Sequence, residues 1–536
     1  MYGCDIPQGE CSGKPVFLLQ HDKFSIGLRK DNDMVTRKER NKQFILCCIG
    51  FLVILYFSYG LLLQAHYSKD IYFGLANGDE VNWAGWLSLG RIVPVVIKQI
   101  LFSLGLAPTD PVIQTVIFFV LTWISMCILM AAFLRTAPAE NLRDYVVLFS
   151  IVAVSVINPF YLEWFLFPEC YFMFGVSILL SSCAVYAAGK PLTPKRWVLV
   201  LLFAVLAVNS YQACLGICFG YMLTLCLIRH KFVCNIHSIK ELGAVLAANF
   251  IAAMSNMVAI KLLGSASASE NGRGPSLTME TLLDNLRQIL SVQGSFAKNA
   301  FGLLPAGIFT VFLLLFVLLF VYEVWQGRGI AAQGNRVFGV LQTIVVLMGG
   351  YASVFAVQAF SGNLWMSPRT IVGAFCSVAC LLLVLYYQGR GTRGAQQILT
   401  GMVAVLAVFF VGTAQELSSD QLISNRMEQQ EVRIVLNELD NYEKETGKTV
   451  TKVAFTSDAY ITWGYAGVTG SYDINTRATA YSNYYGAMLE WLSGRRFEEV
   501  DYATVKSDAP QQENWDSFNV SEQVDFVDDT LCIIIY

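Results

Sequence analysis

Long apolar segments dominate this chain and decide what it can fold into. A helix that crosses the apolar part of a membrane needs about 20 mostly apolar residues, and the sequence supplies many such segments. Only 14% of the 536 residues are charged, whereas an ordinary globular protein has roughly 25%. The chain is therefore predicted to be an all-α polytopic membrane protein. It has no basic face interleaved with aromatic residues, so we expect no nucleic-acid partner.

Eleven spans are expected in total. Two apolar regions, 145–188 and 196–228, are broken by the polar sequences "NPFYLEWFLFPE" (158–169) and "NSYQ" (209–212), and each break predicts a hairpin of two helices. The first arm of each hairpin is short, which would draw both loops below the membrane surface. The remaining spans are predicted at about 43–65, 110–134, 240–263, 306–326, 337–359, 370–388 and 397–415.

Basic residues beside the spans predict the orientation. "RKERNK" (37–42) directly precedes the first apolar segment, and no cleavable signal peptide is visible. Because Lys and Arg collect on the cytoplasmic side, we expect 1–42 to be a cytoplasmic tail of a protein of the bacterial plasma (inner) membrane. Residues 43–416 are then the transmembrane region, and the acidic segment 417–536 is an extracytoplasmic domain.

The C-terminal segment is mixed in character and predicts a small α/β domain. A helix is expected over 426–447, where a Gly stops it, and strands are expected over 448–456 and 529–536.

Two long loops, 66–109 and 264–305, fall on the predicted outer side. The stretch 83–105 has helical apolar spacing and predicts one or two helices lying in the interface, with Pro94 at the bend. The stretch 276–294 predicts another amphipathic helix, opened by a Ser cap. The tryptophans of this side are interpreted as interfacial anchors: Trp83, Trp86, Trp164 and Trp365.

Polar side chains collect at the outer ends of the spans rather than in their middles. A transporter should carry ionisable residues at mid-membrane depth, and these spans have almost none. The pattern instead predicts a cavity that is open to the outside, where a lipid-borne substrate could place its head group. The residues concerned are Asp79, Glu80, Arg91, Asn158, Glu163, Glu169, Tyr211, Gln212 and Arg369.

This combination of residue types suits group transfer from a lipid phosphate. The planar guanidinium of arginine makes two charge-assisted hydrogen bonds to a phosphate. A carboxylate can take the proton from an attacking hydroxyl.

Four motifs in this order resemble those of the type-II glucosyltransferases of bacterial O-antigen modification, which belong to the GT-C superfamily. They are "GDEVNWAGWLSLGR" (78–91), "NPFYLEWFLF" (158–167), "SYQA" (210–213) and "SPR" (367–369), and the resemblance covers about residues 44–390. It implies a GT-C-like fold, an undecaprenyl-phosphate-linked sugar donor, an acceptor polysaccharide at the outer face, and inversion at the anomeric carbon. A hexose is expected, with glucose the first choice.

The resemblance also implies roles for residues. It places an acid in the first outer loop, which maps onto Asp79 or Glu80. The family tends to have two aspartates there, whereas this chain has Asp-Glu followed by Asn82 and Trp83. It therefore stays open which acid acts as the base, and whether the two hold a divalent cation such as Mg²⁺ or Mn²⁺. Contacts to the donor phosphate or substrate are expected from Arg91, Glu163, Arg369, Tyr211 and Gln212.

Two other functions stay open. One is a transporter or flippase of lipid-linked sugars, and the other is a non-catalytic scaffold for glycan assembly. The glycosyltransferase hypothesis implies further partners besides the lipid bilayer: a lipid-sugar flippase and a cytoplasmic polyprenyl-phosphate sugar synthase.

Overall fold

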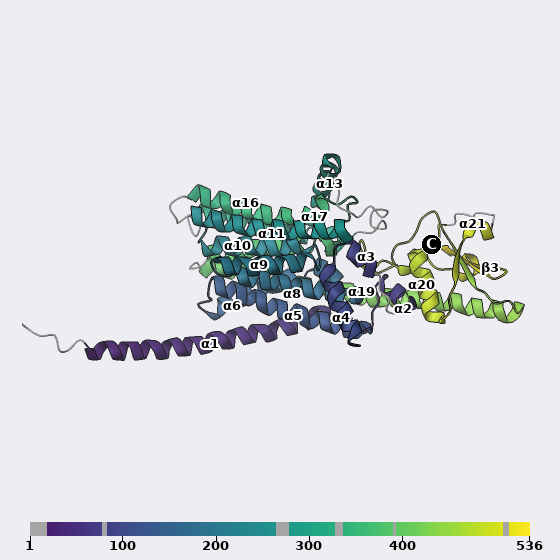
Figure 1. The fold of residues 1–536 in the computed structure, drawn as a ribbon, viewed down its shortest axis with the longest axis horizontal. Coiled ribbons are helices and arrows are strands. Elements are labelled where there is room, and N and C mark those ends of the chain that lie inside the picture. The colour runs from purple at the N-terminus through teal and green to yellow at the C-terminus, as the bar shows by residue number, and fades with distance from the viewer. Residues whose placement is uncertain (1–18, 78–82, 264–277, 327–335, 390–392, 507–513) are drawn as a thin grey trace, which may run out of the picture.

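The computed structural model describes residues 19–77, 83–263, 278–326, 336–389, 393–506 and 514–536. Long helices lie side by side in one bundle, and a smaller domain stands clear of one end of it (Figure 1). Helix α1 projects beyond the opposite end. We call the end that faces the smaller domain the site end, and the end where α1 projects the far end.

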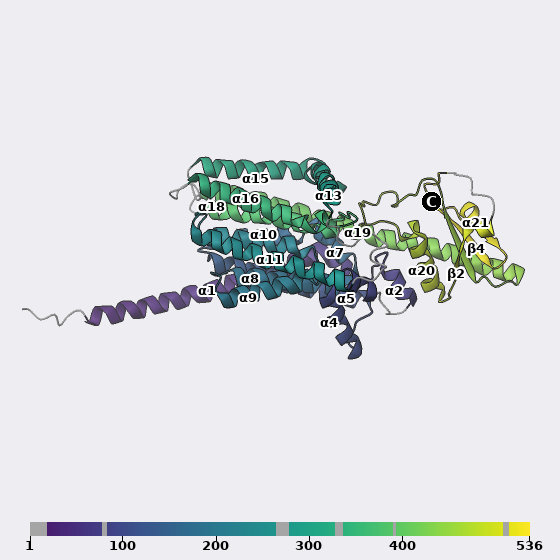
Figure 2. The ribbon, with the colours of Figure 1, turned by 45° about the horizontal axis from the view of Figure 1, so that its top comes forward.

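Every predicted span corresponds to a helix of the bundle. Among the described residues, seven helices are long and apolar enough to cross a membrane, or up to eight if a bent pair counts as one span. Helices α9, α10 and α18 have 15 or 16 residues and pack in the same bundle (Figure 2). The bundle helices are α1 Leu19–Tyr59, α5 Pro111–Thr136, α6 Leu142–Val156, α8 Tyr171–Ala188, α9 Pro194–Val208, α10 Cys214–Arg229, α11 Ile236–Leu263, α15 Ile308–Trp325, α16 Arg336–Val354, α18 Gly373–Gln388 and α19 Arg393–Thr446.

A polar residue followed by proline starts several of these helices. The Asp110 carboxylate accepts hydrogen bonds from the backbone N–H groups of Val112 (2.8 Å) and Ile113 (3.0 Å), so it caps α5. Thr193 caps α9 in the same way, again with a proline next. Proline suits the first helical position, because its missing N–H would have no partner there and its φ is already helical.

The same device bends the predicted hairpin at residue 158. Helix α7 (Pro159–Phe165) leaves α6 at an angle of 60°. The Asn158 side chain caps α7 by accepting from the N–H groups of Phe160 and Tyr161. Because Pro159 cannot continue the hydrogen bonding of α6, the chain turns here and resumes through the short helix η2 (Pro168–Cys170) into α8.

Short helices cover the site end, and two details differ from the sequence-based expectation. The break in 83–105 lies at Gly90, with φ +72°, rather than at Pro94, because a proline is tolerated in the first turn of the following helix. The 276–294 helix is capped by Thr278, while Ser276 lies outside the described residues. These helices are η1 Gly60–Leu63, α2 Ile71–Asn77, α3 Trp83–Ser88, α4 Ile92–Ser103, α13 Met279–Ser291, α14 Gln293–Asn299, η3 Ala300–Gly302, α17 Ala356–Ala359 and η5 Pro368–Thr370.

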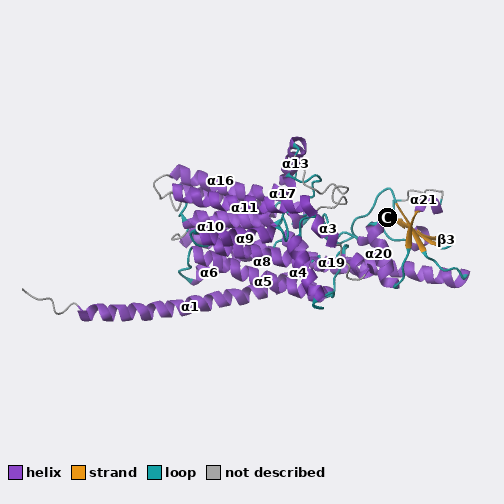
Figure 3. Ribbon diagram, viewed as in Figure 1, coloured by secondary structure: helices purple, strands orange, loops and turns teal. Residues whose placement is uncertain are grey.

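The C-terminal part combines the end of α19 with a four-stranded sheet, and the strands of Figure 3 lie only there. The sheet order is β2-β1-β4-β3, with β1 parallel to β2 and β4, and β3 antiparallel to β4. Helix α19 crosses position 417 without a break and stops at Gly447, whose φ is +68°. The other elements are β1 Lys452–Ser457, η6 Ala478–Ala480, α20 Ser482–Ser493, β2 Glu498–Asp501, α21 Tyr502–Val505, α22 Val520–Gln523, β3 Val524–Val527 and β4 Thr530–Ile535.

Helix α2, although it follows the first span, belongs to the core of the C-terminal domain. Its Tyr72 is fully buried in the same apolar cluster as Val432 of α19 and Met488 of α20. The segment just after the first span is therefore fixed to the C-terminal domain.

Candidate active site

A cavity of about 510 Å³ opens at the site end between α9, α10, α11, α17 and the loop that precedes α18. Its lining combines polar and apolar side chains. The polar ones include Arg91, Tyr211, Gln212 and Arg369, and α11 contributes the apolar side chains Leu246, Phe250, Met254, Met257 and Ile260. Four of the residues predicted from sequence as substrate contacts thus line one cavity.

Arg91 is placed by the turn that separates α3 from α4. The Gln212 side-chain amide donates to the Leu89 carbonyl, and the Asn256 amide donates to the Gly90 carbonyl at 2.9 Å. These bonds fix the turn against α10 and α11. The Arg91 guanidinium then lies 5.3 Å from the centre of the Tyr211 ring. Burial raises the pKa of Tyr211 to about 12, so this ring is a neutral phenol beside the cation.

Gly90 is required at this turn for two reasons. Its φ of +72° is a left-handed conformation that side chains disfavour. A Cβ atom on Gly90 would also lie 2.7 Å from Cγ1 of Ile260 and 2.8 Å from the Asn256 amide nitrogen. The Gly-Arg pair of "LSLGR" therefore lets the turn approach α11 closely while Arg91 faces the cavity.

Arg369 is held by Glu163 across 206 positions of sequence. The Glu163 carboxylate accepts from the Arg369 backbone N–H at 2.5 Å and from its guanidinium at 2.8 Å. The Trp164 indole N–H donates to the Arg369 carbonyl at 3.0 Å. Glu163 has no exposed surface, whereas the Arg369 side chain keeps 19%. The buried Glu163 thus fixes the position of Arg369, and Arg369 lines the cavity.

A chain of alternating charges runs from Glu163 into the C-terminal domain. The second terminal nitrogen of Arg369 lies 2.8 Å from the Asp473 carboxylate, and the other oxygen of Asp473 accepts from Lys69 at 2.5 Å. Burial disfavours the charge of Arg369, but the carboxylates of Glu163 and Asp473 outweigh it and raise the pKa of Arg369. We call Glu163, Arg369, Asp473 and Lys69 the ion chain. The ion chain contains two cations and two carboxylates, so its charges are balanced.

Asp473 is in place because the loop that carries it is tied to the bundle. The Thr469 N–H donates to Asp420 of α19 at 2.8 Å, and the Ser471 hydroxyl donates to the Phe301 carbonyl at 2.7 Å. Sequence analysis singled out neither Asp473 nor the pairing of Lys69, because no local pattern shows that residues 69, 369 and 473 meet. The sequence "SYD" (471–473) matches no motif that would predict a site.

Asp79 and Glu80, the predicted catalytic acids, lie outside the described residues. The described chain ends on one side at α2, which packs on the C-terminal domain, and resumes at α3, whose following turn carries Arg91. The assignment of a general base to Asp79 or Glu80 stays a prediction from sequence.

Two further side chains of the 158–169 hairpin are placed by the structure. Trp164 is fully buried, so its expected role as an interfacial anchor is wrong. Its ring stacks on Phe174 with 4.9 Å between ring centres. The Glu169 carboxylate accepts from the Ser68 hydroxyl at 2.7 Å, which joins the start of α8 to the segment after the first span.

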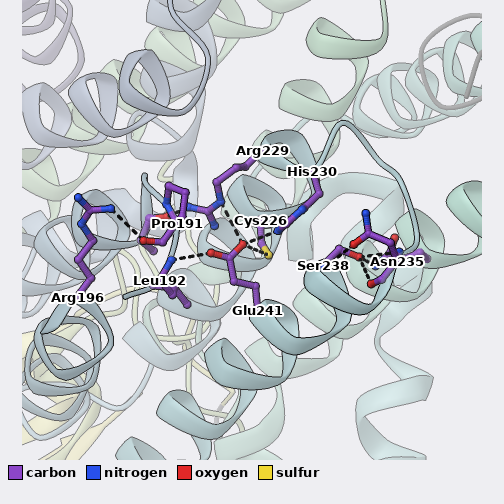
Figure 4. Close-up of polar contacts among 11 residues, drawn as sticks. Pro191, Leu192, Arg196, Cys226, Arg229, His230, Asn235, Ser238 and Glu241 are labelled. Atoms are coloured by element: carbon purple, nitrogen blue, oxygen red, sulfur yellow. Dashed lines mark hydrogen bonds and ion pairs between the residues drawn. The ribbon is translucent and has the colours of Figure 1, made fainter. Parts of the chain in front are cut away.

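A second carboxylate, the partly buried Glu241, has several polar partners at the far end (Figure 4). It accepts from the Leu192 N–H at 2.6 Å and from the Arg229 guanidinium at 3.2 Å, and its Oε2 lies 2.6 Å from His230 Nε2. Glu241, His230 and Cys226 form the one group of three potential metal ligands found in the described ranges. The Arg229 cation on the same oxygen disfavours a metal ion there. We call this set the Glu241 cluster.

Comparisons with known proteins complete the description of the site. The family model described as "Glucosyl transferase GtrII" matches residues 61–387. No curated protein matches the chain.

Two solved structures from Archaeoglobus fulgidus are similar in shape. One is an oligosaccharyltransferase in complex with zinc and sulfate, with a TM-score of 0.37 and 10% identity, covering 83% of this chain and 61% of that chain. The other is the archaeal oligosaccharyltransferase AglB in complex with an inhibitory peptide and a dolichol-phosphate, with a TM-score of 0.35 and 11% identity, covering 84% and 64%. This chain thus spans less than two thirds of the length of either, and we infer nothing about activity from them.

Proposed function

The chain belongs to the GtrII glucosyl transferase family, and from this premise we propose that it moves a hexose, glucose first, from undecaprenyl phosphate to a surface polysaccharide. The transfer takes place on the outer face of the bacterial plasma membrane and inverts the anomeric carbon. Family membership supports the glycosyltransferase activity. The lipid-linked donor, the identity of the sugar and the side of the membrane are what we propose in addition.

The shape and chemistry of the cavity carry the proposal of a lipid-linked donor. Such a donor is amphiphilic, with an apolar polyprenyl tail on one side of a phosphate and a sugar on the other. The cavity offers both kinds of surface, since two arginines and the apolar side chains of α11 line it together. With the phosphate bound by the arginines, the polyprenyl tail would lie along α11 and would stay in apolar surroundings.

The reaction needs a base and a site for the leaving group. The acceptor hydroxyl attacks the anomeric carbon and forms the new C–O bond, while the bond from that carbon to the phosphate oxygen breaks. The hydroxyl proton passes to Asp79 or Glu80. Arg91 stabilises the negative charge that builds on the departing polyprenyl phosphate.

The ion chain assigns different tasks to the remaining residues. Both terminal nitrogens of Arg369 are engaged by carboxylates, so Arg369 presents its remaining edge to the cavity as a fixed positive charge. Glu163 is a positioning residue, since it acts on the substrate only through Arg369. Tyr211 and Gln212 support Arg91 by the ring contact and by the bond to the Leu89 carbonyl.

A divalent cation, if one takes part, would be held by Asp79 and Glu80. The proposed steps use the protein's own acid and arginines.

The test is a transfer assay with purified protein in liposomes. Undecaprenyl-phosphate-[¹⁴C]glucose is supplied together with surface polysaccharide from the organism that makes this protein. We expect labelled polysaccharide and free undecaprenyl phosphate from the wild type, and neither from Asp79→Asn. The same assay with EDTA and then with added Mg²⁺ or Mn²⁺ tests the cation.

Two outcomes would replace the proposal. Movement of the labelled lipid across the liposome membrane without transfer would favour a flippase. Binding of polysaccharide with neither movement nor transfer would favour a scaffold in glycan assembly.

A further inference from the structure

A row of aromatic side chains lies on the C-terminal domain and on α2. The ring centres of Trp463 and Tyr481 are 5.1 Å apart, those of Tyr481 and Tyr484 are 5.4 Å apart, and those of Tyr484 and Phe73 are 5.2 Å apart. Trp463 is 51% exposed and Phe73 is 39% exposed, while the two tyrosines between them are half-buried. We call these four residues the aromatic row. A folded domain gains nothing by leaving such large apolar rings in water.

Charged and hydroxyl groups interrupt the row. The Lys69 ammonium lies 4.7 Å from the centre of the Tyr481 ring and 5.9 Å from that of Tyr484. The Tyr484 hydroxyl donates to the Asp70 carboxylate at 2.7 Å. A protein partner would favour a drier and more continuous apolar patch. A sugar ring instead has a face of C–H groups surrounded by hydroxyls, and rings alternating with carboxylate, ammonium and phenol groups match both parts.

The row is connected to the cavity through the ion chain. Lys69, which lies over Tyr481, is paired with Asp473, and Asp473 is paired with Arg369 at the cavity. The row also lies on the domain that stands clear of the bundle (Figure 1), where a long polymer can reach it. Because Phe73 belongs to α2, the row ends on the helix that precedes Asp79 and Glu80 in the sequence.

We propose that the aromatic row is a binding subsite for the acceptor polysaccharide, separate from the place where the acceptor hydroxyl reacts. This inference rests on the proposed function and adds to it where the acceptor lies. The row binds the C–H faces of the sugars, and the Lys69 and Asp70 side chains bind their hydroxyls. The subsite recognises a chain of sugars rather than a single one, so it increases affinity without touching the reacting atoms.

The experiment compares a long and a short acceptor. The long acceptor is the surface polysaccharide of the source organism, and the short one is a single repeat unit cut from it. For Trp463→Ala we expect KM for the polysaccharide to rise about tenfold, with kcat unchanged. KM for the single repeat unit should rise much less, because a short acceptor can cover only a small part of the row. Trp463→Phe keeps a ring and should restore most of the affinity.

The control is Tyr442→Ala. Tyr442 stacks on Phe526 of the sheet with 4.4 Å between ring centres, so this change removes a ring of the same domain outside the row. It should leave both KM values unchanged. Thermal unfolding of each variant shows that the domain stays folded. An unchanged KM for the polysaccharide in Trp463→Ala, or an equal rise for both acceptors, would overturn the inference.

A binding measurement separates this inference from the proposed function. Polysaccharide is titrated into wild type and Trp463→Ala by calorimetry, without any donor. Tighter binding by the wild type supports the row even if no transfer is seen, in which case the proposed function alone fails. Equal binding by both proteins, with normal transfer by both, refutes the row and leaves the proposed function intact.

Discussion

The two ends of the bundle both pair a carboxylate with an arginine, yet they are built differently: Glu163 at the site end is fully buried, whereas Glu241 at the far end is partly exposed. At the far end, Glu241 meets partners that lie between 11 and 49 positions away in the sequence. At the site end, Glu163 meets Arg369 over 206 positions, and Lys69 meets Asp473 over 404. The far-end cluster ties neighbouring helices together, whereas the ion chain joins the bundle to another domain.

The difference has a physical consequence. Bonds between neighbouring helices stabilise local packing and can form early in folding. The ion chain forms only when the bundle and the C-terminal domain are both in place, so it reports the assembly of the whole site. We therefore expect changes at the site end to alter transfer, and changes at the far end to alter stability alone.

The largest effect is expected from Asp79, the acid that the sequence predicts as the general base. Asp79→Asn should lower kcat at least about 100-fold, because an amide cannot accept the proton of the acceptor hydroxyl. Transfer of labelled glucose by purified protein measures it. Glu80→Gln is the matched change at the next position. Normal rates in both variants would show that neither Asp79 nor Glu80 is the general base. The expectation that the site end, unlike the far end, carries the chemistry would then lose its main support.

A smaller loss of transfer is expected when the ion chain is broken at its centre. Arg369→Gln removes a fixed charge from the cavity and should lower kcat about tenfold or more. It also leaves Glu163 buried without a cation, which costs roughly 3–5 kcal/mol of stability. Adding Glu163→Gln should restore much of the melting temperature but not the rate. If the double variant regains both, the ion chain has a structural role only.

A moderate effect is expected at the turn that places Arg91. In Gly90→Ala the new Cβ meets α11, and the backbone is strained at φ +72°. The turn should shift away from α11 and carry Arg91 with it, which raises KM for the lipid-linked donor several-fold. Gly74→Ala is the control, because a Cβ there meets no atom within 4 Å. An unchanged donor KM in Gly90→Ala would mean that the position of Arg91 is unimportant.

The smallest effect on transfer is expected at the far end. Glu241→Gln keeps the bulk of the side chain but weakens its bonds to Arg229 and His230, so the protein should lose about 1–3 kcal/mol of stability. Thermal unfolding in detergent measures this loss. The rate of transfer at a temperature well below the melting point should equal that of the wild type. A slowed reaction would show that the two ends are coupled, which the comparison excludes.

Much of the fold could be predicted because the signals are local. A run of apolar residues forms a helix in a membrane wherever it occurs, so all the predicted spans correspond to helices. The Asn158-Pro159 break and the Gly447 stop are also encoded in a few neighbouring residues. Pro94 misled the prediction of the bend, since its effect depends on its position in the helix, and Gly90 provided the turn.

The candidate site could be predicted only in part. Arg91, Tyr211, Gln212 and Arg369 share a cavity, in keeping with their predicted place at the same membrane depth. Trp164 was interpreted as an anchor because tryptophan is common at interfaces, but the hairpin folds it into the core. Asp473 had no signal, since a single aspartate in a polar loop resembles any other until its partner is known.

The sequence alone determined that this chain is a helical membrane protein with a small α/β domain, and it predicted that the polar residues lie at one membrane depth. Hydrophobic length and capping are properties of short segments, and they need no knowledge of the rest of the chain. Only the tertiary structure decided that Glu163 faces Arg369 and that Asp473 and Lys69 complete the ion chain. A buried charge gains its stability from partners that the chain brings from far away, and nothing near it in the sequence says which those are.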